Sequence, residues 1–425
     1  MVAQTFLSDV FKLAVSRTTP VSTITICQGG RRYRMNVRLA TRPEETAFIA
    51  EYNLPADGGM PVSIAGPSEL SKALEPAWSV EKGAAQKAHF HPECGWMNDP
   101  NGLFFLDGEW HVFYQYNPLG VSWDNMHWGH AVSKDLKCWR HLPIALHPDE
   151  FGVMYSGSAV VDERGVAGFG KDAVLLYYTN CDVETHKGTQ CLAFSTDRGR
   201  TFRKFNGGLP IIGNITGDCD RDPNIAWDPQ ANVWRMALYL GTGRSKSSFL
   251  LFESSDLLHW TPTDIYDIPE GAECPGIRPM VDEATGDLRW LFTEASGRYR
   301  IGMVLPNGRV SFNDNRTGRF LYGNAYAGQT FFGTPFGKTV YLSWIRMAPS
   351  PERQWTGCLS TPMELHLNNG ELHVRPFFNL ADYNTAKLED YLEFTPEGAA
   401  GTGRVLTDTF TWEFFDDSLH FTVIN

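Results

Sequence analysis

Three carboxylic acids in the sequence have neighbours that suit acid–base and nucleophilic chemistry: Asp99 in WMNDPNG, Asp222 in DRDPN and Glu273 in AECPG. A proline follows each aspartate, which should place the aspartate in extended backbone and aim its carboxylate rigidly. Arg221 would keep Asp222 ionised, whereas the alanine, cysteine and proline around Glu273 favour its uncharged form. Two ionised carboxylates beside one protonated carboxyl are the groups that cleavage of a glycosidic bond requires.

Aromatic and polar side chains accompany these acids along the chain. Trp and Tyr rings can stack on sugar rings, while amide and hydroxyl groups can hydrogen-bond sugar hydroxyls. Core packing explains any one of the aromatic residues more simply, so the interpretation depends on their occurring together. The candidate binding residues are Trp96, Asn98, Gln115, Trp123, Tyr155, Ser156, Arg221 and Tyr326, with Tyr116, Trp128 and Gln329 in or near the same segments.

The elements that must position these residues form a repeat. A turn followed by an apolar, β-rich run recurs at 107–115, 170–179, 229–240, 286–294 and 337–345. One polar segment precedes each run: WMNDPNG, YSGS, DRDPN, AECPG and AYAGQT. Five units, each long enough for four strands, predict a five-bladed β-propeller over residues 88–375; a solenoid is the alternative, although its repeats are usually shorter and more alike. Because the first strand of each blade lines the central channel, the polar segments should meet in one pocket.

A serine–aspartate pair before an aromatic residue also recurs with this repeat. Serine and aspartate side chains commonly hydrogen-bond the backbone of their own turn, so we interpret the pattern as turn chemistry without a catalytic role. The pairs are Ser133 and Asp135, Ser195 and Asp197, and Ser254 and Asp256.

The rest of the chain is also predicted to be all-β. Strand-like runs at 21–26, 33–40 and 46–54 indicate an accessory β-module over residues 1–80, and residues 68–77 should form one or two helical turns. Residues 376–425 are expected to be a β-rich C-terminal extension, too short for an independent sandwich.

Composition excludes several classes of function. The net charge is −12, with 49 acidic and 37 basic residues, which argues against binding to nucleic acid or to an anionic membrane. Aromatic residues make up 13% of the chain and glycines number 40, which favours strands and turns. The N-terminus lacks a basic region before an apolar stretch, so we expect a cytoplasmic protein, or a secreted one whose leader is missing from this sequence. The oligomeric state is not predicted.

Three cysteines flank the acid motifs, which raises the alternative of a metal site. Cys94, Cys219 and Cys274 lack the short paired spacing of tetrahedral zinc ligands, and buried cysteine is usually a small apolar residue. We therefore expect neither a metal nor a cofactor.

Six segments together resemble glycoside hydrolase family 32, the β-fructofuranosidases, which include invertases, inulinases and levanases. They are HFHPECGWMNDPNGLFF, FYQYNP, HWGHAVSKDL, YSGSAVVD, RDP and ECP, in this order. The resemblance implies a retaining, metal-free enzyme that releases terminal β-D-fructose from fructans, fructo-oligosaccharides or sucrose. It implies that Asp99 is the nucleophile, that Asp222 stabilises the transition state and that Glu273 is the general acid/base. The positions that would line the fructose pocket are Asn98, Gln115, Trp123, Ser156 and Arg221.

The sequence departs from the family pattern at Gly276, Asn224 and Leu321, where the family usually has Asp, Lys and Asp. The C-terminal β-sandwich of the family is absent or reduced to the tail, and residues 1–80 resemble a small N-terminal module of some gut-bacterial members. Three alternatives stay open: a fructosyltransferase, in which a sugar replaces water as acceptor; a fructan-binding propeller without turnover; and an arabinan-type glycosidase, which WMNDPNG disfavours.

Overall fold

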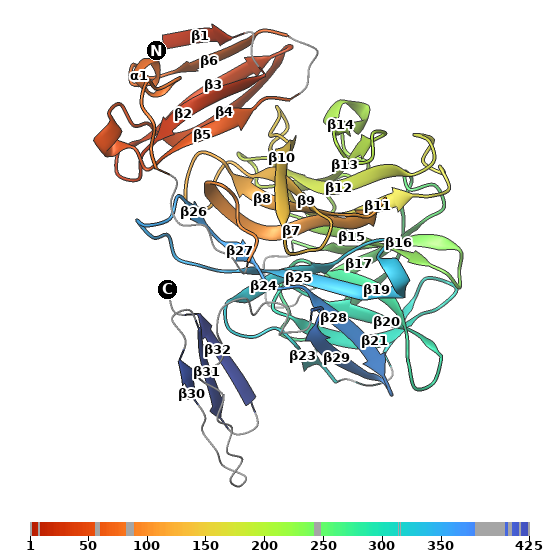
Figure 1. Ribbon diagram of the computed structural model, residues 1–425. Coiled ribbons are helices and arrows are strands. Elements are labelled where there is room, and N and C mark those ends of the chain that lie inside the picture. The colour runs from red at the N-terminus through yellow and green to blue at the C-terminus, as the bar shows by residue number, and fades with distance from the viewer. Residues whose placement is uncertain are drawn as a thin grey trace.

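The computed structural model describes residues 2–6, 9–55, 60–81, 89–241, 248–312, 314, 316–378, 404–406, 410–415 and 418–423. Within these ranges the chain is almost entirely β-strands and loops, which confirms the all-β part of the predicted fold class (Figure 1). The segment 68–77 forms a single helical turn, α1 (Leu70–Ala73). Short 3₁₀ turns are η1 (Pro43–Glu45), η2 (Phe205–Gly208) and η3 (Pro335–Gly337). No helix among the described residues is long and apolar enough to cross a membrane.

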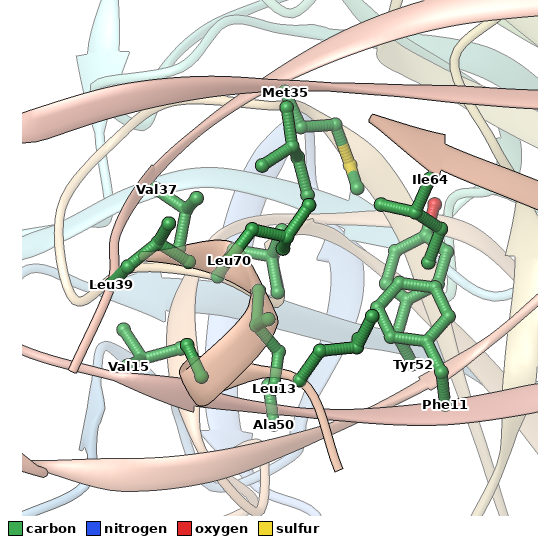
Figure 2. Close-up of a cluster of buried hydrophobic side chains, with 14 of the residues drawn as sticks. Phe11, Leu13, Val15, Met35, Val37, Leu39, Ala50, Tyr52, Ile64 and Leu70 are labelled. Carbon is green, nitrogen blue, oxygen red and sulfur yellow. The ribbon is translucent and has the colours of Figure 1, made fainter. Parts of the chain in front are cut away.

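Two small sheets lie near the N-terminus. One has the order β1 (Val2–Phe6), β6 (Val62–Gly66), β3 (Val21–Gln28) and β4 (Arg31–Arg38), and the other pairs β2 (Val10–Val15) with β5 (Phe48–Asn53). Buried and more exposed residues alternate along β4 and β5, as expected for strands with one face on a core. The predicted strands at 21–26, 33–40 and 46–54 correspond to β3, β4 and β5. Figure 2 shows the buried side chains that these sheets share, among them Phe11, Met35 and Tyr52.

Five larger sheets follow in chain order, and each begins with the strand that contains or follows one of the polar segments. The first has the order β10 (Trp139–Leu146), β9 (His127–Ser133), β8 (Glu109–Asn117), β7 (Gly95–Leu106) and β26 (Trp355–Thr356). The second consists of β11 (Val153–Asp162), β12 (Ala173–Cys181), β13 (Gly188–Ser195) and β14 (Arg203–Lys204). The third consists of β15 (Arg221–Asp228), β16 (Val233–Tyr239), β17 (Ser248–Ser254) and β18 (Thr261–Asp267).

The last two of these sheets each carry one additional short strand. The fourth consists of β19 (Gly276–Val281), β20 (Leu288–Thr293), β21 (Arg298–Val304) and β22 (Val310–Phe312), with β23 (Gly318–Arg319) paired to β21. The fifth consists of β24 (Ala325–Thr330), β25 (Thr339–Ile345), β28 (Met363–Asn368) and β29 (Glu371–Pro376), with β27 (Cys358–Leu359) paired to β25.

The first strands of these five sheets contact one another in a closed cycle. β7 contacts β11, β11 contacts β15, β15 contacts β19, β19 contacts β24, and β24 contacts β7. A separate apolar cluster fills the space between each pair of neighbouring sheets; Phe104 packs with Met154 between the first two, for example, and Met97 packs with Phe331 between the fifth and the first. The parallel pairing of β26 with β7 adds a late segment of the chain to the first sheet.

The serine–aspartate pairs lie in the turns after β9, β13 and β17, and the prediction of turn chemistry is confirmed. In each pair the serine hydroxyl donates a hydrogen bond to the aspartate, at 3.0, 2.6 and 3.1 Å. Each aspartate also accepts hydrogen bonds from backbone N–H groups two to four residues further on.

The C-terminal extension contains a three-stranded sheet of β30 (Arg404–Leu406), β31 (Phe410–Phe415) and β32 (Ser418–Val423). Most of the remaining residues of the predicted extension at 376–425 lie outside the described residues, as do parts of the predicted module at 1–80.

Candidate active site

Bulges in the first strands coincide with the polar segments. The register of β7 shifts between Met97 and Pro100, so that Asn98 and Asp99 oppose one residue of β8. Similar shifts occur in β11, β15 and β24, at the segments YSGS, RDPN and AYAGQT. A bulge adds a residue to one strand and changes the direction of its side chain, and bulges are common beside active sites. Because the first strands contact one another, the redirected side chains meet.

Asp99 lies at the centre of this group, and its side chain is almost completely buried. Its Oδ2 accepts a hydrogen bond of 2.6 Å from the Ser156 hydroxyl, and its Oδ1 accepts one of 3.2 Å from the Asn98 amide. Burial, with a further contribution from the negative charge of Glu273, raises the pKa of Asp99 to about 6. The pKa of Asp99 is therefore higher than expected for the predicted ionised carboxylate, because the side chain is buried and Glu273 lies nearby.

The backbone conformation and the pKa of Asp222 both differ from what the sequence predicts. Its φ is 64°, which is left-handed backbone and not the extended conformation expected before a proline; the bulge between Arg221 and Asn224 imposes it. Burial raises the pKa of Asp222 well above its ordinary value; Arg221 lowers it, and the nearby Glu273 and Asp99 carboxyls raise it further. The backbone N–H of Asp222 donates to the Thr179 hydroxyl at 3.0 Å, which fixes the strained residue in place.

Glu273 has an ion-pair partner that its sequence neighbours do not indicate. Arg221 donates two hydrogen bonds to Glu273 Oε2, of 2.6 Å from Nη2 and 3.0 Å from Nε, and Tyr326 donates one of 3.2 Å to Oε1. Arg221 Nε lies farther, at 3.6 Å, from Asp222 Oδ2. The prediction of apolar surroundings for Glu273 is wrong, because the third sheet supplies a guanidinium. Arg221 itself is held by the Cys219 carbonyl at 2.8 Å and by the Tyr239 ring at 4.5 Å.

Cys274 joins two of the acids directly. Its backbone N–H donates to Asp222 Oδ2 at 3.1 Å, and its buried thiol lies 3.5 Å from both Asp99 Oδ2 and Asp222 Oδ2. Both carboxylates therefore face the same atom. The Cys219 sulfur does not join the acids in this way and lies 3.7 Å from that of Cys181. Among the residues that the structure describes, no cluster of three or more His, Cys, Asp or Glu side chains has the arrangement of a metal site.

The predicted polar residues divide into two groups. Asn98 and Ser156 contact Asp99 directly, and Trp96 holds Asn98 through a 3.0 Å hydrogen bond from its indole nitrogen. Gln115 and Gln329 instead connect sheets, because their amides donate to the backbone carbonyls of Met154 and Gly157, each at 2.9 Å. Their buried amides stabilise the bulge that presents Ser156.

The aromatic candidates form two clusters. Trp96 and Tyr326 both pack edge-on against Trp344, at centroid distances of 5.7 and 6.5 Å. Trp123 and Tyr155 pack edge-on at 6.1 Å, and Trp123 is 55% exposed. The sequence analysis missed Trp344, although it lies directly opposite Tyr326 in the register of β24 and β25.

Two further aromatic residues near the polar segments have structural roles. Trp128 is fully buried and donates a hydrogen bond of 3.0 Å to the Tyr155 carbonyl. Tyr116 packs edge-on against Tyr114, beside the core between the first and fifth sheets.

The three departures from the family pattern have local structural explanations. Asn224 accepts a hydrogen bond of 3.0 Å from the Ile277 backbone and so links β15 to β19. A Cβ at Gly276 would lie 2.3 Å from the Thr293 hydroxyl oxygen, so any larger residue would displace Thr293. Leu321 is buried against the core between the fourth and fifth sheets.

Comparison with known proteins gives a consistent result. The family model of the glycosyl hydrolases family 32 N-terminal domain matches residues 89–376. A levanase of Bacillus subtilis is 36% identical over 307 residues, which cover 66% of this chain and 44% of the levanase. An extracellular exo-inulinase of Aspergillus awamori is 28% identical over 358 residues, 70% of this chain and 66% of the inulinase. The structure of a fructofuranosidase from Schwanniomyces occidentalis complexed with fructose superposes with a TM-score of 0.62 at 27% identity, covering 72% of this chain and 66% of that one. The chain thus spans less than half the length of the levanase.

Proposed function

The chain belongs to glycosyl hydrolase family 32, and on this premise we propose that it is a retaining glycosidase that releases terminal β-D-fructose from fructans, fructo-oligosaccharides or sucrose. One observation carries the proposal: Asp99 of β7, Asp222 of β15 and Glu273 of the loop before β19 are joined in one site through Cys274 and Arg221. Related proteins include a levanase, an invertase and an exo-inulinase, which supports fructose as the released sugar.

In the first step Asp99 attacks the anomeric carbon of the terminal fructosyl unit. The bond from that carbon to the glycosidic oxygen breaks, and its electron pair goes to the leaving oxygen, which takes a proton from Glu273. The products are a fructosyl ester of Asp99 and the free leaving-group sugar. Ser156 and Asn98 hold the Asp99 carboxylate in a fixed direction for this attack.

In the second step Glu273, now ionised, takes a proton from water while the water oxygen attacks the same anomeric carbon. The ester bond breaks, its electron pair returns to Asp99, and fructose leaves with retained configuration. Asp222 and Arg221 lie beside the reacting groups, where they would bind fructose hydroxyls and stabilise the charge of the transition state.

We assign the remaining candidate residues to substrate binding. Trp96, Tyr326 and Trp344 would form one wall of the pocket, and Trp123 with Tyr155 a second one nearer solvent. Solved structures of related enzymes are complexed with fructose, fructosyl-erythritol, fructosylnystose or 1-kestose. Sugars of this class would suit a site of carboxylates, amides and aromatic rings.

We also propose that residues 88–375 form a five-bladed propeller and the catalytic domain, with residues 1–80 as an accessory module and 376–425 as an extension. The closed cycle of contacts among β7, β11, β15, β19 and β24 supports this arrangement, as do the apolar clusters between neighbouring sheets.

The test is the release of free fructose from sucrose, inulin and levan, with products resolved over time. We expect wild-type protein to release fructose from at least one of them, and Asp99→Asn to lose at least about a thousandfold in rate while staying folded. At high sucrose concentration, products longer than the substrate would indicate that the fructosyl group is transferred to a sugar in place of water. No fructose from any substrate, or full activity of Asp99→Asn, would contradict the proposal.

A further inference from the structure

The loop between β8 and β9, residues 118–126, connects the two N-terminal sheets to the candidate site. We call it the Trp123 loop. Trp123 is 55% exposed, and its ring meets the edge of Tyr155, next to the bulge that presents Ser156. An exposed indole needs support from its own loop to hold a fixed direction, since little packs around the ring itself.

That support comes from the N-terminal sheets through Asn36 of β4. The backbone N–H of Asn36 donates to the side-chain oxygen of Asn125 at 2.8 Å, and the Asn125 amide donates back to the Asn36 carbonyl at 2.7 Å. The Asn125 side-chain amide thus forms the same two hydrogen bonds with the backbone of β4 that a residue of a neighbouring strand would form. The Asn36 side chain adds a 3.2 Å hydrogen bond to Asp124.

Both ends of the Trp123 loop have further contacts with the same sheets. Near its start, Leu119 is buried in the core of the N-terminal sheets and Val121 packs against that core. Just after its end, the Tyr52 hydroxyl of β5 hydrogen-bonds the His127 imidazole at 2.8 Å. Three separate contacts from the N-terminal sheets therefore flank Trp123.

Asn125 also organises the loop internally. Its amide donates to the Asn117 side-chain oxygen at 3.1 Å, and the same oxygen accepts the Leu119 backbone N–H at 3.1 Å. One buried side chain therefore joins the first large sheet, the loop and the N-terminal sheets. Replacing it should free Trp123 without touching the carboxylates.

We infer that the N-terminal sheets act as a positioning element of the substrate site, in which Asn36 and Asn125 hold the Trp123 loop so that Trp123 and Tyr155 form a fixed wall for the bound sugar. This inference rests on the proposed function, because it gives Trp123 a sugar to contact. Asn125 is a positioning residue: it acts on substrate binding through Trp123.

The principal test replaces Asn125 by glycine, which removes the amide but tolerates the φ of 45° at this position. Asn232→Gly is the matched control, because Asn232 is an exposed asparagine with a φ of 55° in the turn between β15 and β16. We expect Asn125→Gly to raise KM for the best fructoside about two- to tenfold with kcat nearly unchanged, and Asn232→Gly to change neither. An unchanged KM in Asn125→Gly would overturn the inference.

A double-mutant cycle with Trp123→Ala separates positioning from general damage. If Asn125 acts through Trp123, Asn125→Gly should raise KM no further in the Trp123→Ala background. Additive effects of the two substitutions would overturn the inference. Asp124→Ala, at a half-buried position, removes the hydrogen bond from the Asn36 side chain to the loop but keeps the buried Asn125 amide. This variant should also raise KM.

Hydrogen exchange of the backbone amides at 119–126 tests the inference without substrate. Exchange there should be faster in Asn125→Gly than in wild-type protein and unchanged in Asn232→Gly. Equal protection in all three proteins would overturn the inference even if wild-type protein releases fructose. If wild-type protein releases no fructose, the proposed function fails, and this measurement still decides whether Asn125 holds the loop.

Discussion

Arg221 provides the positive charge nearest to Glu273 and Asp222 in the candidate site. Its guanidinium donates two hydrogen bonds to Glu273 and lies 3.6 Å from Asp222, while Asp99 binds only neutral groups: Ser156, Asn98 and the thiol of Cys274. Burial raises the pKa of Asp99 to about 6 and that of Asp222 well above its ordinary value. Among the described residues, neutral donors thus stabilise the anion of Asp99, which would keep this proposed nucleophile reactive near neutral pH.

The role of Glu273 predicts a response that depends on the leaving group. Glu273→Gln should slow cleavage of sucrose about a hundredfold or more, because a sugar alkoxide needs a proton to depart. An activated fructoside does not need it, so its first step should slow much less and the fructosyl-enzyme should accumulate. Azide needs no base and should restore turnover, giving fructosyl azide of retained configuration. Initial rates and product configuration check this.

An equal loss on both substrates, without azide rescue, would assign the acid/base role to another carboxyl such as Asp222. Glu283→Gln provides a control, because Glu283 is an exposed acid that hydrogen-bonds His366 on the fourth and fifth sheets, away from the carboxylate cluster. It should cleave both substrates at wild-type rates.

The raised pKa of Asp99 predicts a pH-dependent gain in stability for Asp99→Asn. A carboxyl whose pKa is higher in the folded than in the unfolded chain opposes folding once it must ionise, so wild-type protein loses this stability as pH rises from about 4 to about 6. The asparagine has no proton to lose. The stability of Asp99→Asn relative to wild type should therefore increase by on the order of 2 kcal/mol between about pH 4 and about pH 7.5.

Urea unfolding at both pH values measures this difference. Asp107→Asn, at an exposed turn residue, controls for the removal of one negative charge. A stability difference between Asp99→Asn and wild type that stays constant or shrinks as pH rises would contradict the prediction.

At the scale of the strand, the site depends on bulges. In β11 the register passes from Tyr155 opposite Thr179 to Gly157 opposite Tyr178, which leaves Ser156 as the additional residue. Its hydroxyl consequently reaches Asp99 on the neighbouring sheet at 2.6 Å. Gly157 permits this geometry, since a Cβ there would lie 1.9 Å from the Tyr177 carbonyl oxygen.

Gly157→Ala should therefore destabilise the protein by about 3 kcal/mol or more and abolish most activity, because the bulge and Ser156 must move. Gly213→Ala is the matched control: a Cβ at Gly213 has nothing within 4 Å, and its φ is not left-handed. It should stay within about 0.5 kcal/mol of wild type. Thermal unfolding and the rate of fructose release check both variants, and a Gly157→Ala protein as stable and active as wild type would show that the bulge is dispensable.

The sequence allows the polar segments to be predicted as one group, because their spacing follows the repeat and each lies at or beside the first strand of a sheet. The sequence does not predict that Arg221 pairs with Glu273. This contact joins β15 to the loop before β19, whereas the sequence shows only that Asp222 is the neighbour of Arg221 in the chain. The left-handed backbone of Asp222 is missed for the same reason: the bulge that imposes it depends on pairing with β16. Trp344 is missed because a single tryptophan in an apolar run matches core packing equally well.

At the scale of the whole molecule, the N-terminal sheets and the first large sheet share buried contacts. Leu119 lies in the N-terminal core. His127 of β9 hydrogen-bonds Tyr52, and His147, just after β10, hydrogen-bonds the carbonyl of Asn53. Strands in residues 1–80 are predictable from alternation, but this interface is not. Its residues are ordinary core residues and buried histidines, whose partners only the three-dimensional arrangement reveals.

The net charge of −12 gives a last prediction, about the class of substrate. Long-range electrostatic steering requires charge on both partners and weakens with salt, whereas the proposed fructosides are uncharged. Because partly buried ion pairs such as Arg221 with Glu273 are screened less than exposed pairs, kcat/KM for sucrose or levan should change less than about twofold between about 20 and about 500 mM NaCl. Initial rates at low substrate concentration, with thermal unfolding recorded at each salt concentration, measure this. A rise of tenfold or more with salt would indicate repulsion of an anionic substrate, and an equal fall would indicate attraction of a cationic one; either result would contradict a neutral fructoside as the substrate.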